Sequence, residues 1–358
     1  MSKKKLWRKT IISCLVFCLL LMPLSGQITK GEAASWTDQL LYAAAAVALV
    51  TSYYNNVNEH GQKGMLSSTQ KQTGVYDNPQ AKERIHSITA RLKGSGLIKA
   101  DYAVYANPQK DFNAFCTLGH VISVNKGALD ALDDDELASV LGHEMGHGEK
   151  RHVVKGVTKT VGLGLAVDLY LGSNDNNASY ILSGLGANYI NNEMFTMEQE
   201  WEADNEGFNY AVAAGFNPGG PAASMAKLRS LYGELQHEGL IKVINPNNHP
   251  KTSDRIHNFS AKLTVYSNNH VTVKNDKTVL IDGKEIITPL KTNRYLPEER
   301  AYLIAGNLAA VYHNNTLETA IAADDGAVYI GNQKIAAPAD NDIAAEELAD
   351  RLNTAIGK

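Results

Sequence analysis

Residues 139–152 read SVLGHEMGHGEKRH, with three histidines and two glutamates in fourteen positions. Asp133 and Glu136 precede this stretch with the spacing of a capping box, so we expect a helix to begin at Asp133. Leucine and valine side chains at helical spacing give that helix an apolar stripe. The stretch therefore predicts a helix that packs one face into a protein core.

His143, Glu144 and His147 fall on or beside the apolar stripe, so their side chains are expected to point inward. Burying two imidazoles and a carboxylate without partners is costly, and a metal ion would satisfy them. The histidines are four positions apart, so both rings reach one ion from one helical face. Glu144 is then placed as a general base and acid, which takes a proton from the attacking water and passes it to the leaving amine. A solvated helix with hydrogen-bonded histidines is the alternative, because helices also contain HExxH by chance.

A catalytic zinc ion takes three protein ligands and keeps one open position. The stretch FTMEQEWEADNEGFNYAVAAGFNP begins at residue 195, and it places Glu200 and Asp204 on one face of a predicted helix over residues 195–214. Glu200 would bind the metal, and Asp204 would hydrogen-bond the far nitrogen of a ligand histidine. Four other glutamates lie in the same region: Glu193, Glu198, Glu202 and Glu206. They leave the choice of ligand open on the residues alone, and a solvated acidic face is the alternative.

Residues 1–34 have the layout of a secretory signal peptide. A basic start, MSKKKLWRKT, is followed by the apolar run IISCLVFCLLLMPL and then by GEAAS. The apolar run is shorter than the roughly 20 residues that a membrane-spanning helix needs. We therefore expect export to the periplasm or cell envelope, with cleavage near residue 34. An uncleaved anchor, and with it membrane association, is the alternative.

The net charge bears on which partners the chain binds, and the cysteine content bears on whether it forms a disulfide. The first 34 residues contain six basic residues and one acidic residue, so their removal changes the net charge from −4 to −9. An acidic chain without basic clusters argues against nucleic acid as a partner. Cys14 and Cys18 lie in the expected signal peptide, so Cys116 alone remains and no internal disulfide is expected.

The composition changes after residue 260. The stretch VLIDGKEIITP at 279–289 is echoed 49 positions later by VYIGNQKIAAP at 328–338, and each copy precedes a helical pattern. This predicts a separate C-terminal α+β domain, residues 261–358, that is built from two strand–strand–helix repeats. It contains no catalytic signature, so it is a candidate surface for a partner in the cell envelope.

The motifs and their order resemble the family of HExxH zinc metallopeptidases that includes HtpX, BepA, LoiP and the CAAX prenyl protease. NAFCTLGHVISVNKGAL precedes HEMGH, and EWEAD, AGFNP and HPKTSDRI follow it, over roughly residues 40–260. The resemblance implies an α+β fold, with a mainly helical zincin-like (minigluzincin) peptidase domain and a small sheet over residues 35–260. It also implies one zinc ion per chain, bound by His143, His147 and Glu200, with Asp204 hydrogen-bonded to a ligand.

The resemblance gives roles to two downstream residues, His249 and Arg255. His249 would cover the metal as a fourth ligand and act as an autoinhibitory plug, or it would stabilise the oxyanion together with Arg255. A loop histidine without a role in the site is the alternative. The strand over 121–124 would bind an extended substrate by strand addition if it lies exposed at the edge of its sheet, and an ordinary buried strand is the alternative.

The expected function is that of an exported zinc metalloendopeptidase of gluzincin type. Its substrates would be unfolded, misassembled or membrane-associated polypeptides, as in protein quality control of the cell envelope. The alternative is a non-proteolytic chaperone or binding module with a closed structural zinc site, in which His249 is a permanent fourth ligand. Glu144 discriminates between the two, because a structural site does not need a carboxylate at that position.

Overall fold

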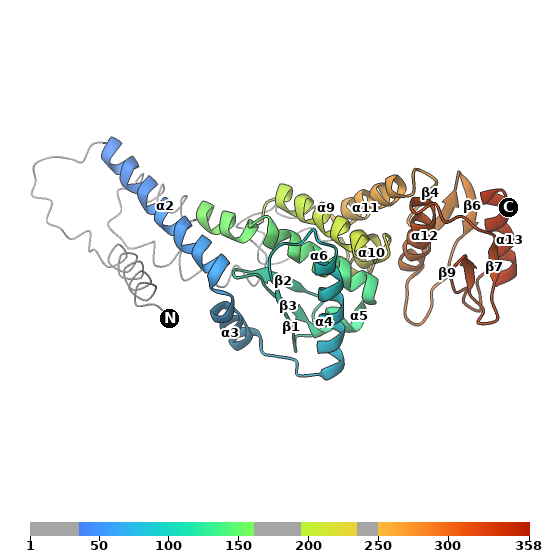
Figure 1. Cartoon of the computed structure of the whole chain (residues 1–358), viewed down its shortest axis with the longest axis horizontal. Coiled ribbons are helices and arrows are strands. Elements are labelled where there is room, and N and C mark those ends of the chain that lie inside the picture. Colours follow the sequence, from blue (N-terminus) through green and yellow to red (C-terminus); the bar gives the residue numbers. More distant parts are fainter. Residues whose placement is uncertain (1–35, 161–194, 235–249) are drawn as a thin grey trace, which may run out of the picture. The chain divides into compact units, whose positions relative to one another are not determined.

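The computed structural model of the chain describes residues 36–160, 195–234 and 250–358 (Figure 1). The predicted signal peptide and His249 lie outside these residues. The described chain combines helices with small sheets, as an α+β peptidase domain requires. It divides into two compact units, and the second contains both the HExxH helix and residues 261–358, the predicted C-terminal domain.

The first unit is built around α2, Trp36–His60. Tyr54 and Val57 of this helix pack against buried Leu118, Val153 and Phe195. The N–H of Gly119 donates to Oδ1 of Asn58, and Arg151 pairs with Glu59 at 2.8 Å. Across the described residues, no helix combines the length and apolar character that crossing a bilayer demands.

The second unit contains a three-stranded sheet with the order β1-β3-β2. Its strands are β1 Ala103–Asn107, β2 Ala114–Thr117 and β3 Val121–Asn125. β1 and β3 are parallel, and all five residues of β3 are buried. The strand over 121–124 is therefore central and buried, so the alternative of an ordinary buried strand holds and the exposed edge is excluded. Its apolar residues fall on both faces of the sheet, which is typical of a strand that is covered on both sides.

Helices α6 and α9 lie side by side over this part of the unit (Figure 1). The helices that surround the sheet are α4 Pro79–Gly94, α5 Lys126–Ala131, α6 Asp134–Glu149 and α9 Met197–Ala213. The predicted capping box of α6 is confirmed, because the Asp133 side chain accepts from the N–H of Glu136 and the Glu136 side chain accepts from the N–H of Asp133. α9 begins with the same device at Thr196 and Gln199.

Two glycines allow α6 and α9 to touch through their backbones. A Cβ atom on Gly207 would lie 2.6 Å from the main-chain nitrogen of His143, and one on Gly142 would lie 2.9 Å from the carbonyl oxygen of Gly207. Both distances are shorter than ordinary van der Waals contact. The close crossing brings the side chains of the two helices into one site.

We expect Gly207→Ala to lower the free energy of unfolding by about 1–3 kcal/mol, because the added methyl group forces two packed backbones apart. The measurement is denaturant unfolding of the purified protein. Gly94→Ala in α4 is the matched control, because a Cβ atom there meets no atom within 4 Å. Equal stability of the two variants would show that the helix crossing tolerates a methyl group.

The C-terminal part of the unit has two three-stranded antiparallel sheets. The first is followed by α12 and the second by α13, and their elements are β4 Val271–Lys274, β5 Thr278–Ile281, β6 Lys284–Ile287, α12 Pro297–His313, β7 Ala320–Ala322, β8 Val328–Ile330, β9 Gln333–Ala336 and α13 Ala345–Ile356. Each helix therefore follows three strands and not the two expected. The strand pairing of the first sheet recurs in the second 49 positions later, including the irregularity in register.

The two halves share one core. α12 packs against β4 and β5 of its own half and against β9 of the other, whereas α13 packs against β7 and β8 and also against β6. α10, Gly220–Tyr232, and α11, Thr252–Tyr266, connect this part to the peptidase helices. Residue 260, where the composition changes, lies within α11.

Candidate active site

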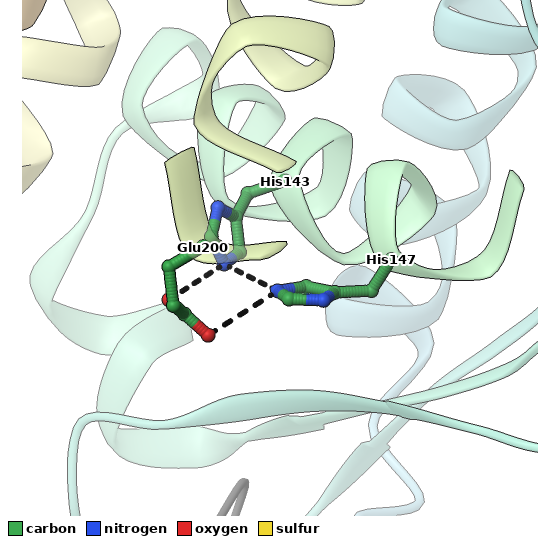
Figure 2. A group of neighbouring side chains, drawn as sticks. All are labelled: His143, His147 and Glu200. Atoms are coloured by element: carbon green, nitrogen blue, oxygen red, sulfur yellow. Dashed lines mark hydrogen bonds and ion pairs between the residues drawn. The ribbon is translucent and has the colours of Figure 1, made fainter. Parts of the chain in front are cut away.

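Three side chains from α6 and α9 converge on one point. His143 and His147 stand one helical turn apart on α6, and Glu200 reaches toward them from α9 (Figure 2). Their ligand atoms all lie within 4.8 Å of one another. The Nε2 atoms of the histidines are 3.1 Å apart, and the Glu200 oxygens lie 3.7 Å and 3.5 Å from them. The structure thus brings together the three residues that the sequence proposed as metal ligands.

The donor set fits a zinc ion. Two imidazole nitrogens and one carboxylate form the ligand set of a catalytic zinc site with an open fourth position. Nδ1 of His143 lies 2.8 Å from Oδ1 of Asp204. Because the Asp204 carboxylate is an acceptor, the proton sits on Nδ1, and the lone pair of Nε2 faces Glu200 and His147.

Asp204 is fully buried, and Arg255 holds it in place. Arg255 donates from Nε to Oδ2 of Asp204 at 2.8 Å and from Nη2 to Oδ1 at 2.5 Å. Burial raises the pKa of Asp204, but the Arg255 charge and the His143 hydrogen bond outweigh burial, so that the pKa falls below its usual range. Arg255 thus contacts the metal ligands through Asp204, and its Nη2 also lies 3.4 Å from Nδ1 of His143. Its role in stabilising the oxyanion with His249 stays a prediction.

Glu144 lies beside the ligands and is 3% exposed. Its Oε2 accepts a hydrogen bond from the main-chain N–H of Cys116 in β2, at 2.8 Å. Burial raises the pKa of Glu144 to about 7. The contact with Cys116 was not predicted, because a main-chain donor leaves no signal in the residue type.

The position of His249 falls outside the described residues. The chain resumes at Pro250, which is buried, and α11 begins at Thr252. The structure therefore places Arg255 in the site and gives no position for His249.

We expect Asp204→Asn to weaken zinc binding by about 10–100-fold, because the amide does not fix the protonated nitrogen of His143 as a carboxylate does. Competition with a chromophoric chelator measures the zinc affinity directly. Asp254→Asn, at an exposed position in the first turn of α11, is the matched control. Unchanged zinc affinity in Asp204→Asn would rule out the orienting role.

Comparison with known proteins places this geometry in a sequence context. The model of "Peptidase family M48" matches residues 79–262. The chain is 30% identical over 168 residues to "Metalloprotease LoiP" of Escherichia coli, and the match covers 46% of this chain and 63% of that protein. It is 31% identical over 209 residues to a "Protease HtpX homolog" of Salinibacter ruber, which covers 48% of this chain and 71% of that protein.

A third relative is more distant. The chain is 24% identical over 153 residues to a "Putative beta-barrel assembly-enhancing protease" of Vibrio cholerae, and the match covers 40% of this chain and 32% of that protein. The chain thus spans less than two thirds of LoiP and about a third of the Vibrio protein.

Proposed function

This chain belongs to peptidase family M48, as its motifs predicted, and we propose that it is an exported zinc-dependent endopeptidase of unfolded or misassembled proteins. The observation that carries the proposal is the convergence of the His143, His147 and Glu200 ligand atoms within 4.8 Å. Glu144, adjacent to His143 in the sequence, supplies the group for proton transfer that a purely structural site does not need.

The proposed chemistry divides between the metal and the protein. When bound by the three ligands, zinc supplies Lewis-acid polarisation of the scissile carbonyl. Glu144 accepts a proton from the attacking water and returns it to the leaving amine. The Cys116 N–H holds one oxygen of Glu144 at 2.8 Å, which leaves the other oxygen for proton transfer. Asp204 and Arg255 fix the ring of His143.

Burial of the site supports an extended substrate. The side chains of His147 and Glu200 are 1% and 4% exposed, and that of His143 is 14% exposed. The surface of a folded domain does not reach side chains at such depth, whereas a single extended segment does. We therefore propose that the enzyme acts on unfolded or loosely folded segments.

We further propose that His249 regulates access to the metal as a removable fourth ligand. The support is its place in HPKTSDRI, the segment that also supplies Arg255, and the burial of its neighbour Pro250. If His249 covers the metal, His249→Ala will cleave casein faster than the wild type. If it stabilises the oxyanion instead, the same variant will be slower.

The proposal also covers the location of the protein in the cell and its partners. The signal-peptide layout of residues 1–34 supports export, and the printed name of the Vibrio relative refers to β-barrel assembly. We propose that the chain works in protein quality control of the cell envelope. Residues 35–260 would carry the peptidase activity, and the duplicated domain at residues 261–358 would bind a partner.

Cleavage of casein by the purified protein, with zinc content measured in parallel, tests the proposed function. We expect about one zinc ion per chain, loss of cleavage on treatment with a chelator, and recovery when zinc is added back. A protein that keeps its zinc and suppresses aggregation of an unfolded client without cleaving it would instead be a chaperone with a closed zinc site. A protein that binds no zinc would contradict both.

A further inference from the structure

Two buried glutamates from distant parts of the chain meet beside the start of the metal-binding helix. Glu136 is the third residue of α6, and Glu299 is the third residue of α12 in the C-terminal domain. Both are 0% exposed. One oxygen of each accepts a hydrogen bond from its own helix start, with Asp133 N–H donating to Glu136 at 2.8 Å and Leu296 N–H donating to Glu299 at 2.7 Å.

The remaining oxygens of the two glutamates lie where α10 packs against both α6 and α12, a region called the joint below. Positive charges in the joint are too few to balance two ionised carboxylates. The carboxyl of Glu299 lies within hydrogen-bonding reach of the carboxyl of Glu136. Lys227 of α10 places Nζ 2.8 Å from Oε1 of Glu299. Among the described residues, neither Oε1 of Glu136 nor Oε1 of Glu299 has a hydrogen-bond partner, so the Lys227 contact is an ion pair without hydrogen-bond geometry. One lysine therefore faces two buried carboxyl groups.

The other ionisable groups around the joint do not correct this imbalance. Tyr295 donates to Asp133 at 3.2 Å, and Arg84 of α4 pairs with Asp134 on the exposed side. The other charged and titratable groups on the packed elements are Asp133, Asp134, Asp135, Arg84, Arg91, Lys227 and Tyr295, and Glu298 pairs with Lys277. Neither arginine pairs with Glu136 or Glu299.

The joint itself is tightly packed. Nδ2 of Asn217 donates to the carbonyl of Leu303 and to Oδ1 of Asn307 in α12, both at 2.9 Å. A Cβ atom on Gly219 would lie 1.8 Å from the carbonyl oxygen of Tyr302. α12 is therefore packed closely against the residues that precede α10, and the two glutamates themselves are fully buried.

We propose that Glu136 and Glu299 share one proton at neutral pH, and that this proton holds the C-terminal domain against the start of the metal-binding helix. Two ionised carboxylates in contact at a buried site repel each other strongly, and a single proton between them replaces repulsion with a hydrogen bond. The shared proton also satisfies Oε1 of Glu136. The shared proton stabilises the docking of the C-terminal domain, and this role does not depend on whether the chain cleaves peptides.

The electrostatics of the site agree with this geometry. Burial, the charge of Asp133 and the carboxyl of Glu299 raise the pKa of Glu136 to about 9, from 4.5 for an ordinary glutamate. Between a pH of about 4.5 and a pH of about 9, the folded protein therefore keeps a proton on Glu136 that the unfolded chain has released. The contribution of Glu136 to the free energy of unfolding is complete below a pH of about 4.5 and is lost as the pH rises toward about 9.

Glu136→Gln tests the proposal, because the amide is a permanent donor to Glu299 and does not titrate. Between neutral pH and about 9, we expect the Tm of the wild type to fall by about 2–4 °C more per pH unit than that of the variant. Glu298→Gln, at the neighbouring position in a pair with Lys277, is the control and should follow the wild type. The infrared difference spectrum of the wild type minus Glu136→Gln at neutral pH should show the carbonyl band of a protonated carboxylic acid, because the Glu144 carboxyl is common to both proteins and cancels.

Domain docking is followed in the same samples by hydrogen exchange in the first turn of α12, corrected for the intrinsic effect of pH. Exchange should rise with pH in the wild type and remain level in Glu136→Gln. If Glu136→Gln does not fold, Glu299→Gln gives the Glu136 carboxylate a permanent amide donor, and its Tm should depend less steeply on pH than that of the wild type. Equal pH slopes in all variants, or a difference spectrum of wild type minus Glu136→Gln without a carboxylic acid band, would overturn the shared proton.

Discussion

Glu144→Gln should lower kcat/KM for peptide hydrolysis by about 10²–10⁴-fold while zinc remains bound. The amide has the shape of the carboxylate, and its oxygen still accepts the hydrogen bond that the Cys116 N–H donates at 2.8 Å. It does not take up a proton from water, so the loss is confined to proton transfer. Steady-state cleavage of a fluorogenic peptide and elemental analysis for zinc measure the two effects separately.

The control for this variant is Glu202→Gln on α9. Glu202 is partly exposed and pairs with Lys150 at 3.1 Å, so its substitution should leave both cleavage and zinc content near the wild-type values. A Glu144→Gln enzyme that retains more than about a tenth of its activity would contradict the general base role. Loss of zinc from Glu144→Gln would instead show that Glu144 supports the metal site itself.

Glu200→Ala should have the second large effect, on zinc affinity. Loss of a residue that only supports a ligand costs about 10–100-fold in metal affinity, and loss of a ligand itself should exceed that range. The substitution removes the Glu200 carboxylate and leaves only the two imidazoles, whose Nε2 atoms lie 3.1 Å apart. Zinc affinity by chelator competition and casein cleavage should therefore fall together.

Glu202→Ala and Glu206→Ala are the matched controls, because the sequence alone allowed each of these glutamates as a ligand. Both pair with Lys150, at 3.1 Å and 2.7 Å, and should retain zinc. If either variant lost its zinc while Glu200→Ala kept one ion per chain, the assignment of the third ligand would be reversed.

Local patterns predicted the parts of the site that depend on helical periodicity. The spacing of His143 and His147 places both rings on one face of α6, and the capping box at Asp133 and Glu136 predicted where that helix begins. The face of α9 that carries Glu200 and Asp204 follows from the same periodicity. These features are fixed within a few turns of one helix, so a single sequence contains enough information to predict them.

The features that the sequence did not predict depend on contacts between distant segments. The central position of β3 follows from its pairing with β1 and β2, and the salt bridge from Arg255 to Asp204 joins two residues 51 positions apart on different helices. The meeting of Glu136 with Glu299 depends on the docking of α12. Each residue has an ordinary role within its own element, and its second role exists only once the chain has folded.

The crossed packing of α12 on β9 and α13 on β6 has an architectural consequence. Neither half of the C-terminal domain covers its own sheet completely, so a single half would expose an apolar face. Two copies of such a half would cover each other through a twofold axis, as the subunits of a symmetric homodimer do. The domain therefore has the architecture of a symmetric dimer within one polypeptide, and in its first copy α12 also packs against α10 and α11.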